Sequence, residues 1–460
     1  MKGIYSKAAI TRKQQYPAGD VRNYAHLVRK ETWLEKEFRT GYYVDRVQFT
    51  EGEIWTDAIQ AALDENKRVY VPYFPNRLYI DKTLYIGSGT TLEVCEGTVI
   101  SLKPDSNCCM LTNKNFKVSR SVFEFDCPDT DICITGGTWS LTNNGSYGGN
   151  GNESGKVRDS AGVEHNAFSV MSFTNVKGLR ISNLTFYDIT PFALYVSGIE
   201  DFDIENLKFD KCYRDGVHVC GPASGGRIRN LTGVTGDDFV ALNAYDDFGC
   251  ALSLGKIDHV LVENIASTPG WMWSENRLLA GIFIAEDGRE IDCSVEDCTF
   301  RNCRGFHTYK GYLQANLVPA PVDRPDRSGH MDNLTFENIF VDYIQPSDYY
   351  TVKRSAFEMG TSCNNFTFRN IYFSFPLGDP EYGDWSCVTF GPSFAAFLDS
   401  RGIMPSRNIR FENVFHRVGG RYVEADPSLC ARVVTAEEDG EVIGKGTATE
   451  IYYNEEDKNE

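Results

Sequence analysis

Short runs of alternating apolar and polar residues recur along the chain from about residue 130. Examples are VKGLRISNLTF, IEDFDIENLKF and MDNLTFENIF, and each run has an Asn or Asp near its end. Alternation with a period of two is typical of strands that bury one face. The helices that would separate the strands of a doubly wound α/β fold do not appear in this pattern. The pattern therefore predicts an all-β chain of short strands.

The polar residues near the ends of these runs mark a repeat. The shortest intervals between them give the length of one coil, and the longer intervals hold insertions, which often lie on a binding face. A single coil cannot bury its apolar side chains alone, whereas stacked coils share one core. Asn tolerates left-handed backbone geometry, so we expect these residues to stack as a ladder. We therefore predict a right-handed parallel β-helix, a solenoid. The ladder residues are Asn183, Asn206, Asn230, Asn264, Asp297, Asn338, Asn370 and Asn413.

The segment TDAIQAALDENK, residues 56–67, has the period of an amphipathic helix. Ile59, Ala62 and Leu63 fall on one face, and Thr56 is the expected N-cap. A helix that leads into short strands is expected to cap the open end of the solenoid. We divide the chain into an N-terminal extension (1–50), a β-helix catalytic domain (51–425) and a frayed acidic tail (426–460).

Composition narrows the classes of partner. The formal net charge of −18 disfavours nucleic acid, and it means that an anionic sugar would need a local cationic pocket. No apolar run is long enough to predict a membrane span. The 14 Cys are scattered, without a CxxC pair, and the N-terminus has no signal-like apolar region. We expect free thiols and a cytoplasmic protein; a homo-oligomer stays open.

Two motifs one coil apart carry the candidate chemistry. Asp215 in YRDGVHV precedes one strand-like run, and Asp237 and Asp238 in GDDFVALN precede the next. Rungs of a parallel stack lie about 4.8 Å apart, so the three carboxylates are expected to be neighbours. Crowded carboxylates raise at least one pKa, which suits a general acid beside bases that activate water. The same residues would also suit a Ca²⁺ site or ordinary turns.

Residues 52–420 resemble the polygalacturonases, family 28 of the glycoside hydrolases, and the wider pectin-degrading β-helix superfamily. TDAIQAALDENKRVYVP resembles the N-terminal cap of that family, and ITGGTWSLTNNGSYGGNG resembles its Gly-rich coil. YRDGVHV stands at the family's Asn-Thr-Asp-Gly motif, and GDDFVALN at its Gly-Asp-Asp motif. The resemblance implies an inverting hydrolase in which Asp237 is the general acid and Asp215 and Asp238 hold the attacking water. It implies no metal and no cofactor.

The chain departs from the family at several positions. Tyr213-Arg214 replaces the Asn-Thr before the first aspartate, and the following strand, RLLAGIFIAEDG, has no counterpart of the family's histidine. His307 and Lys310 are the nearest candidates for the basic pair that holds a substrate carboxylate. The hydrolytic motifs are therefore matched more closely than the uronate-binding ones.

Other side chains are expected to line the cleft and bind an oligosaccharide or polysaccharide. His218 and Asn243 alternate with core residues and should point outward beside the aspartates. Arg277 would bind an anionic group, and aromatic faces of Trp271 and Trp273 would suit sugar rings. Two alternatives stay open: a polysaccharide lyase, which needs Ca²⁺ or a base, and a non-catalytic glycan-binding or phage-spike β-helix.

Overall fold

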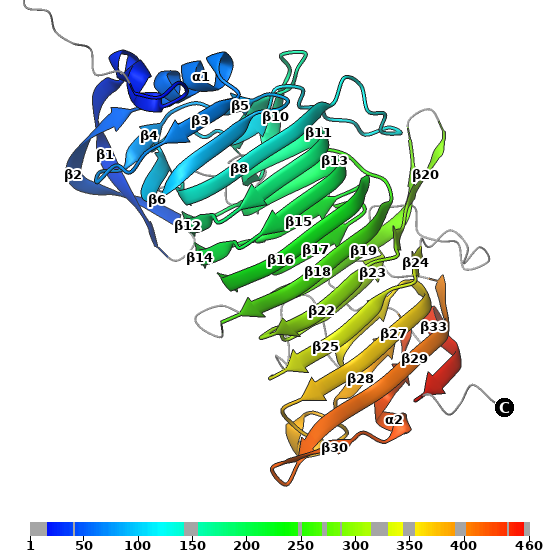
Figure 1. The fold of residues 1–460 in the computed structure, drawn as a ribbon. Helices are drawn as coiled ribbons and strands as arrows, with labels where there is room; N and C mark the ends of the chain where they lie inside the picture. Colours follow the sequence, from blue (N-terminus) through cyan, green and yellow to red (C-terminus); the bar gives the residue numbers. More distant parts are fainter. Residues whose placement is uncertain are drawn as a thin grey trace, which may run out of the picture.

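The computed structural model describes residues 16–39, 42–141, 155–246, 251–268, 274–285, 288–313, 330–343, 355–391, 402–438 and 441–454. Figure 1 shows a stack of parallel strands that runs from the helices at the N-terminal end to strand β33 (Glu441–Tyr453) near the C-terminus. Strands account for nearly all of the regular structure in these residues. The expectation of an all-β chain with parallel strands is confirmed.

One row of strands carries both aspartate motifs, and we call it row 1. Each strand of row 1 pairs in parallel with the equivalent strand of the next coil. The row consists of β5 (Leu84–Ile86), β7 (Leu111–Asn113), β11 (Ser169–Ser182), β13 (Phe192–Glu205), β15 (Val217–Cys220), β17 (Asp238–Asn243), β19 (Glu275–Ile284), β23 (Tyr309–Leu313), β26 (Ser355–Gly360), β28 (Ser386–Phe390) and β31 (Ala431–Val433).

Besides row 1, each coil has two further faces, and these two faces meet at one corner. We call it the shared corner, and several long strands continue through it without interruption. The second halves of β11 and β13 belong to these faces. The remaining strands are β3 (Arg68–Val71), β4 (Leu78–Ile80), β6 (Thr91–Leu102), β8 (Asp129–Ser140), β12 (Thr185–Ile189), β14 (Lys208–Cys212), β16 (Ala223–Thr235), β18 (Ile257–Ser267), β21 (Val295–Glu296), β22 (Thr299–Arg304), β24 (His330–Asp332), β25 (Thr335–Val341), β27 (Ser362–Phe373), β29 (Gly402–Val418) and β33.

The shared corner is built from two left-handed positions that lie five residues apart in each coil. The first position is held by Asp201, Gly225, His259, Asp297, Asn333, Asn365 and Asn408, all with positive φ. The second position is held by Asn206, Asn230, Asn264, Asn302, Asn338, Asn370 and Asn413, also with positive φ. This corner is therefore occupied by residues whose backbone accepts left-handed geometry with little strain, mainly Asn, Asp and Gly.

Asn side chains at the second position bond to one another from coil to coil. Asn302 Nδ2 donates to Asn264 Oδ1, and Asn338 Nδ2 donates to Asn302 Oδ1, both at 2.9 Å. The predicted ladder is confirmed, but its member Asp297 was assigned wrongly. Asp297 lies at the first position, where it accepts a hydrogen bond from Asn333, and Asn302 takes its place in the ladder.

Aromatic rings stack along the interior in the same manner. Phe300, Phe336, Phe368 and Phe411 occupy equivalent places in successive coils, with ring centroids 5.6, 5.3 and 5.2 Å apart. These side chains are buried, so each coil contributes to one continuous core. The coils hold their register through this core on the inside and through the Asn ladder on the outside.

Helix α1 (Thr56–Glu65) lies at the N-terminal end, packed with helix η1 (Val21–Leu27) and beside β5 (Figure 1). Its predicted apolar face is buried. The N-cap is Trp55, so the expected capping role of Thr56 is wrong. Thr56 is the first helical residue, and its hydroxyl donates to Asp81 Oδ1 at 2.6 Å instead. The role of the helix as an end cap stays a prediction. The antiparallel pair β1 (Arg29–Arg39) and β2 (Tyr42–Ile54) lies at the same end.

The C-terminal segment continues the sheet. Residues 444–453 of strand β33 pair in parallel with residues 402–411 of β29, so this part of the C-terminal segment is not the frayed tail that was expected. The division of the chain into three parts stays a prediction. Smaller elements are β9 (Gly155–Arg158), β10 (Glu164–Ala167), β20 (Glu290–Cys293), η3 (Pro380–Tyr382), β30 (Arg421–Glu424), α2 (Pro427–Cys430) and β32 (Thr435–Glu438).

Free thiols and the lack of a membrane span were both expected from the sequence, and both can be examined in the described part of the chain. Its 13 cysteines are free thiols, and nine of them are buried among core side chains, as predicted. Within the same residues, no helix combines the length and the apolar character that crossing a membrane requires.

Candidate active site

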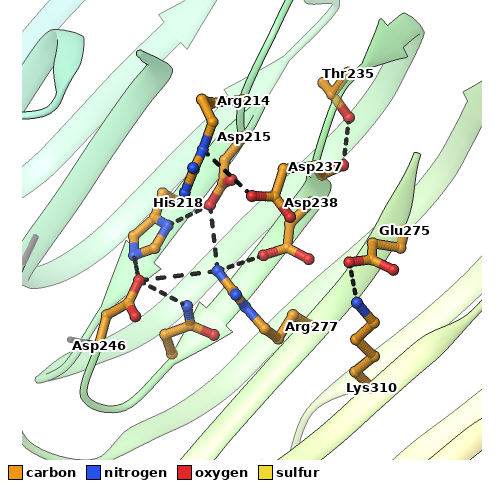
Figure 2. Close-up of polar contacts among 11 residues, drawn as sticks. Arg214, Asp215, His218, Thr235, Asp237, Asp238, Asp246, Glu275, Arg277 and Lys310 are labelled. Carbon is orange, nitrogen blue, oxygen red and sulfur yellow. Dashed lines mark hydrogen bonds and ion pairs between the residues drawn. The ribbon is translucent and has the colours of Figure 1, made fainter. Parts of the chain in front are cut away.

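The backbone of row 1 brings the three aspartates together. Ala193 N donates to Asp215 O at 2.9 Å, and Gly216 N donates to Asp238 O at 2.8 Å, so Asp215 and Asp238 stack one coil apart. One carboxylate oxygen from each of Asp215, Asp237 and Asp238 lies within 4.8 Å of the other two (Figure 2). The juxtaposition predicted from the one-coil spacing is therefore observed, and we call these three residues the triad.

The triad members differ in exposure. Asp215 and Asp238 have no exposed surface, whereas 20% of the Asp237 side chain is exposed. Burial raises the pKa of the Asp237 carboxyl, an effect that Arg214 opposes and Asp215 reinforces. Burial also raises the pKa of Asp238, against the opposing charge of Arg277. Both carboxyl groups thus hold a proton more readily than an ordinary aspartate, and Asp237 is the one that solvent reaches.

Two arginines neutralise part of this negative charge. Arg277 Nη2 lies 2.6 Å from Asp238 Oδ2 and 3.8 Å from Asp215 Oδ2, and Arg214 Nε lies 3.3 Å from Asp237 Oδ2 (Figure 2). Arg277 is in register with Ala241 of β17 and with Lys310 of β23, which places it on the outer face of row 1. Its guanidinium was expected to bind an anionic group, and the anions that it contacts are the triad carboxylates themselves.

His218 lies beside Asp215 as predicted, but it is fully buried rather than exposed. Its Nδ1 is 2.7 Å from Asp215 Oδ2, and its Nε2 is 3.2 Å from Asp246 Oδ2. The imidazole stacks on Phe192, with ring centroids 4.5 Å apart. Burial alone would lower the pKa of His218, but the hydrogen bond to Asp215 and the neighbouring carboxylates raise it to about 10. The ring is therefore an imidazolium held between two carboxylates.

Asn243 supports the same layer of side chains. It is buried, and its Nδ2 donates to Asp246 Oδ2 at 3.3 Å. Asp246 thus accepts from Asn243, pairs with His218 and lies 3.9 Å from Arg277 Nη2. Asn243 points outward from the core as predicted, and its contact in the described residues is with this carboxylate.

A second ion pair continues the network one coil further. Glu275 is the register partner of Asp238, and its carboxylate pairs with Lys310 Nζ. His307 Nε2 lies 3.3 Å from the same carboxylate, and its Nδ1 lies 3.0 Å from Ser274 O. Glu275, His307 and Lys310 are all buried. The two residues proposed to hold a substrate carboxylate are thus close to the triad, but a carboxylate of the protein already occupies both.

Within the described residues, two groups of side chains have donor atoms close enough to share a metal ion. One is the triad; the other is formed by Asp292 of β20, Glu296 of β21 and His330 of β24. In the triad, the Arg277 guanidinium contacts Asp238 and would repel a divalent cation. In the second group, Lys256 pairs with Glu296 in the same way. Both donor sets therefore already hold a protein cation.

Other sequence predictions have mixed outcomes. Trp271 and Trp273 lie outside the described residues. His259 is exposed at the shared corner. Sequence reasoning missed Asp246 and Glu275, and it noted Arg214 only as a departure from the family. Of these, Arg214 carries the clearest signal, since it directly precedes Asp215.

The comparisons with known proteins agree with this fold. No protein-family model matches the sequence, and no curated protein is similar to it. Among solved structures, the chain is similar to an endo-xylogalacturonan hydrolase from Aspergillus tubingensis, with 14% identity and a TM-score of 0.50, over 86% of this chain and 95% of that one. It is also similar to the pre-mature gene product 12 of bacteriophage phi29, with 13% identity and a TM-score of 0.54, over 86% of this chain and 45% of that one.

These likenesses define the class of fold. The chain is a right-handed parallel β-helix of the polygalacturonase-like type. At identities of 13–14%, the likeness concerns the fold alone. The activity has to be argued from the side chains of the site.

Proposed function

We propose that this protein hydrolyses a glycosidic bond of an oligosaccharide or polysaccharide, with inversion at the anomeric carbon. The observation that carries the proposal is the triad, in which three carboxylate oxygens lie within 4.8 Å while only Asp237 is partly exposed. A hydrolase of this kind needs one protonated carboxyl for the leaving group and ionised carboxylates for a water. The triad offers both within one group.

Asp237 suits the role of general acid. Its pKa is raised by burial, and its partial exposure places it where a sugar would approach. Arg214, 3.3 Å away, opposes this rise in pKa and so favours release of the proton. We therefore assign Asp237 the transfer of a proton to the departing oxygen.

Asp215 and Asp238 suit the task of holding the attacking water. A water that donates hydrogen bonds of about 2.8 Å to two carboxylate oxygens would span about 4.4 Å between them. That span fits a group whose oxygens lie within 4.8 Å. Both carboxylates are paired with buried cations, Asp215 with His218 and Asp238 with Arg277. Such pairing orients them and weakens them as nucleophiles, which favours activation of a water over direct attack.

The spacing of the carboxyl groups makes the stereochemical test decisive. Retaining glycosidases typically have carboxyl groups about 5–5.5 Å apart, and inverting ones about 6.5–9.5 Å apart. The short separation here is closer to the retaining range, whereas the cation pairing of Asp215 and Asp238 favours a held water. The configuration of the first product distinguishes the two courses.

The lyase alternative has less support. A lyase needs a base near the substrate or a bound Ca²⁺. The surrounding carboxylates raise the pKa of Arg277 well above its ordinary value even though burial opposes this, so Arg277 is a poor base. The same guanidinium would repel Ca²⁺ from the triad. An unsaturated product that absorbs near 235 nm would favour the lyase.

The first experiment is a screen of glycosides and pectic oligomers with wild type and Asp237→Asn, with NMR to follow the anomers of the product. We expect Asp237→Asn to lower kcat by a factor of about 10² to 10⁴, as loss of a general acid typically does. Asp297→Asn is the matched control, because Asn occupies the equivalent corner position in the following coils. A product that keeps the starting configuration would refute inversion. Glycan binding with no cleavage would favour a non-catalytic β-helix.

A further inference from the structure

Every basic side chain drawn in the close-up of the site has a carboxylate partner from the protein. Arg214 pairs with Asp237, and Arg277 pairs with Asp238. Lys310 pairs with Glu275 (Figure 2). His218 lies between two carboxylates. These pairs form on the outer face of row 1, beside the place where a sugar would meet Asp237.

The cations of this group are matched by carboxyl groups of the protein. Five carboxyl groups, those of Asp215, Asp237, Asp238, Asp246 and Glu275, face three permanent cations and two histidines, His218 and His307. An incoming carboxylate would have to compete with these pairings, in a buried setting where an uncompensated charge is costly.

We infer that the site selects an uncharged sugar ring next to the triad and discriminates against a uronate, an inference that rests on the proposed glycosidase function. Glu275 is the specificity-determining residue, because it occupies the Lys310 ammonium that would otherwise attract a carboxylate. A neutral ring needs only hydroxyl hydrogen bonds, which paired carboxylates and guanidinium groups supply without a change of charge.

Glycan binding to the Asp237→Asn variant separates recognition from cleavage. The probes are short oligogalacturonides, the same oligomers with their carboxyl groups reduced to primary alcohols, and a panel of neutral plant and microbial oligosaccharides, all at about 0.15 M salt to screen the acidic surface. We expect the strongest binding to be to a neutral glycan. Strongest binding to a uronate, or binding to no neutral glycan, would overturn the inference.

Changes at Glu275 test its assigned role. Glu275→Gln in the same background should shift the ratio of neutral to uronate affinity toward the uronate by about tenfold, the effect of one added charge at short range. Glu263→Gln is the matched control: it makes the same change of charge in a carboxylate that also pairs with a cation, Arg301, on a face of the coils away from row 1. We expect that control to leave the ratio unchanged.

A double variant separates loss of the ion pair from release of the Lys310 charge. Glu275→Gln combined with Lys310→Met removes the pair without releasing a charge and should restore the parent ratio. A ratio that moves equally in the double variant and in Glu275→Gln would refute the role of Lys310. Neutral glycans that bind Asp237→Asn but are not cleaved by the wild type would refute the glycosidase and leave the selectivity intact.

Discussion

The charge of His218 should make the stability of the protein depend on pH. The imidazole is buried between Asp215 and Asp246, and its pKa is raised from 6.5 to about 10. The folded protein therefore holds this proton more tightly than the unfolded chain does. The resulting stabilisation is complete below about pH 6.5 and is lost as the pH rises through the folded-state pKa.

The size of the effect follows from the pKa shift. Each unit of difference corresponds to about 1.4 kcal/mol, so His218 should contribute about 4 to 5 kcal/mol below pH 6.5. Between about pH 7 and 9.5, its contribution to the free energy of unfolding should decline by about 1.4 kcal/mol per pH unit. Over the range from pH 6.5 to 9.5, about 3.5 kcal/mol should be lost.

Urea denaturation of wild type and His218→Gln across this pH range is the assay. The difference between their free energies of unfolding should shrink as the pH rises. His259→Gln is the control: Asp258 raises the pKa of His259 too, but this side chain is exposed and solvent screens the pairing, so its difference from wild type should change much less. A His218→Gln difference that does not change with pH, or imidazole ¹⁵N shifts that show a neutral His218 at pH 7, would refute the reasoning.

Two further predictions concern the guanidinium of the site and the ladder. Arg277→Met leaves Asp238 without its partner, so we expect a loss of about 3–5 kcal/mol in the free energy of unfolding. Millimolar Ca²⁺ should raise the Tm of this variant but not of wild type, and equal responses would contradict the electrostatic role. The φ angle of Asn302 is 56°, in the left-handed region, so Asn302→Ala should have a free energy of unfolding about 1–2 kcal/mol lower than Asn302→Gly. Urea denaturation measures this difference, and equal midpoints for the two variants would argue against backbone strain.

The juxtaposition of the triad was predictable because the coils around it are short. Asp215 and Asp238 are 23 residues apart, one uninterrupted coil, so position along the chain translates directly into stacking. The next coil holds an insertion, and Glu275, the register partner of Asp238, comes 37 residues later. Spacing alone could not reveal that partner, because nothing in the pattern fixes how many residues an insertion adds.

The corner of the coils could have been predicted more fully. His259 and Asn264, like Asn333 and Asn338, are five residues apart, and this interval recurs along the chain. Asp297 and Asn302 obey the same interval, which would have placed Asp297 at the first position rather than in the Asn ladder. The error came from treating two stacked positions as one.

The burial of the charged groups could not be predicted from the sequence. Alternation correctly placed His218 on the side away from the core, since Val217 and Val219 are interior. Whether that outer side faces solvent depends on segments from other parts of the chain that cover it. The pairing of Lys310 with Glu275 likewise depends on two coils lying side by side, so only the folded chain shows that a substrate carboxylate would find this ammonium occupied.

The two left-handed positions at the shared corner are always five residues apart, and this constant interval, which we call the arm, limits where such a protein can vary in length. A strand alternates faces with every residue, so a single insertion within that arm would turn ladder and core side chains to the wrong sides. Length differences between coils accumulate instead between strands, for example between β17 and β18 and between β23 and β24. Coils can therefore differ in length without disturbing the ladder, the core or the positions of the triad carboxylates.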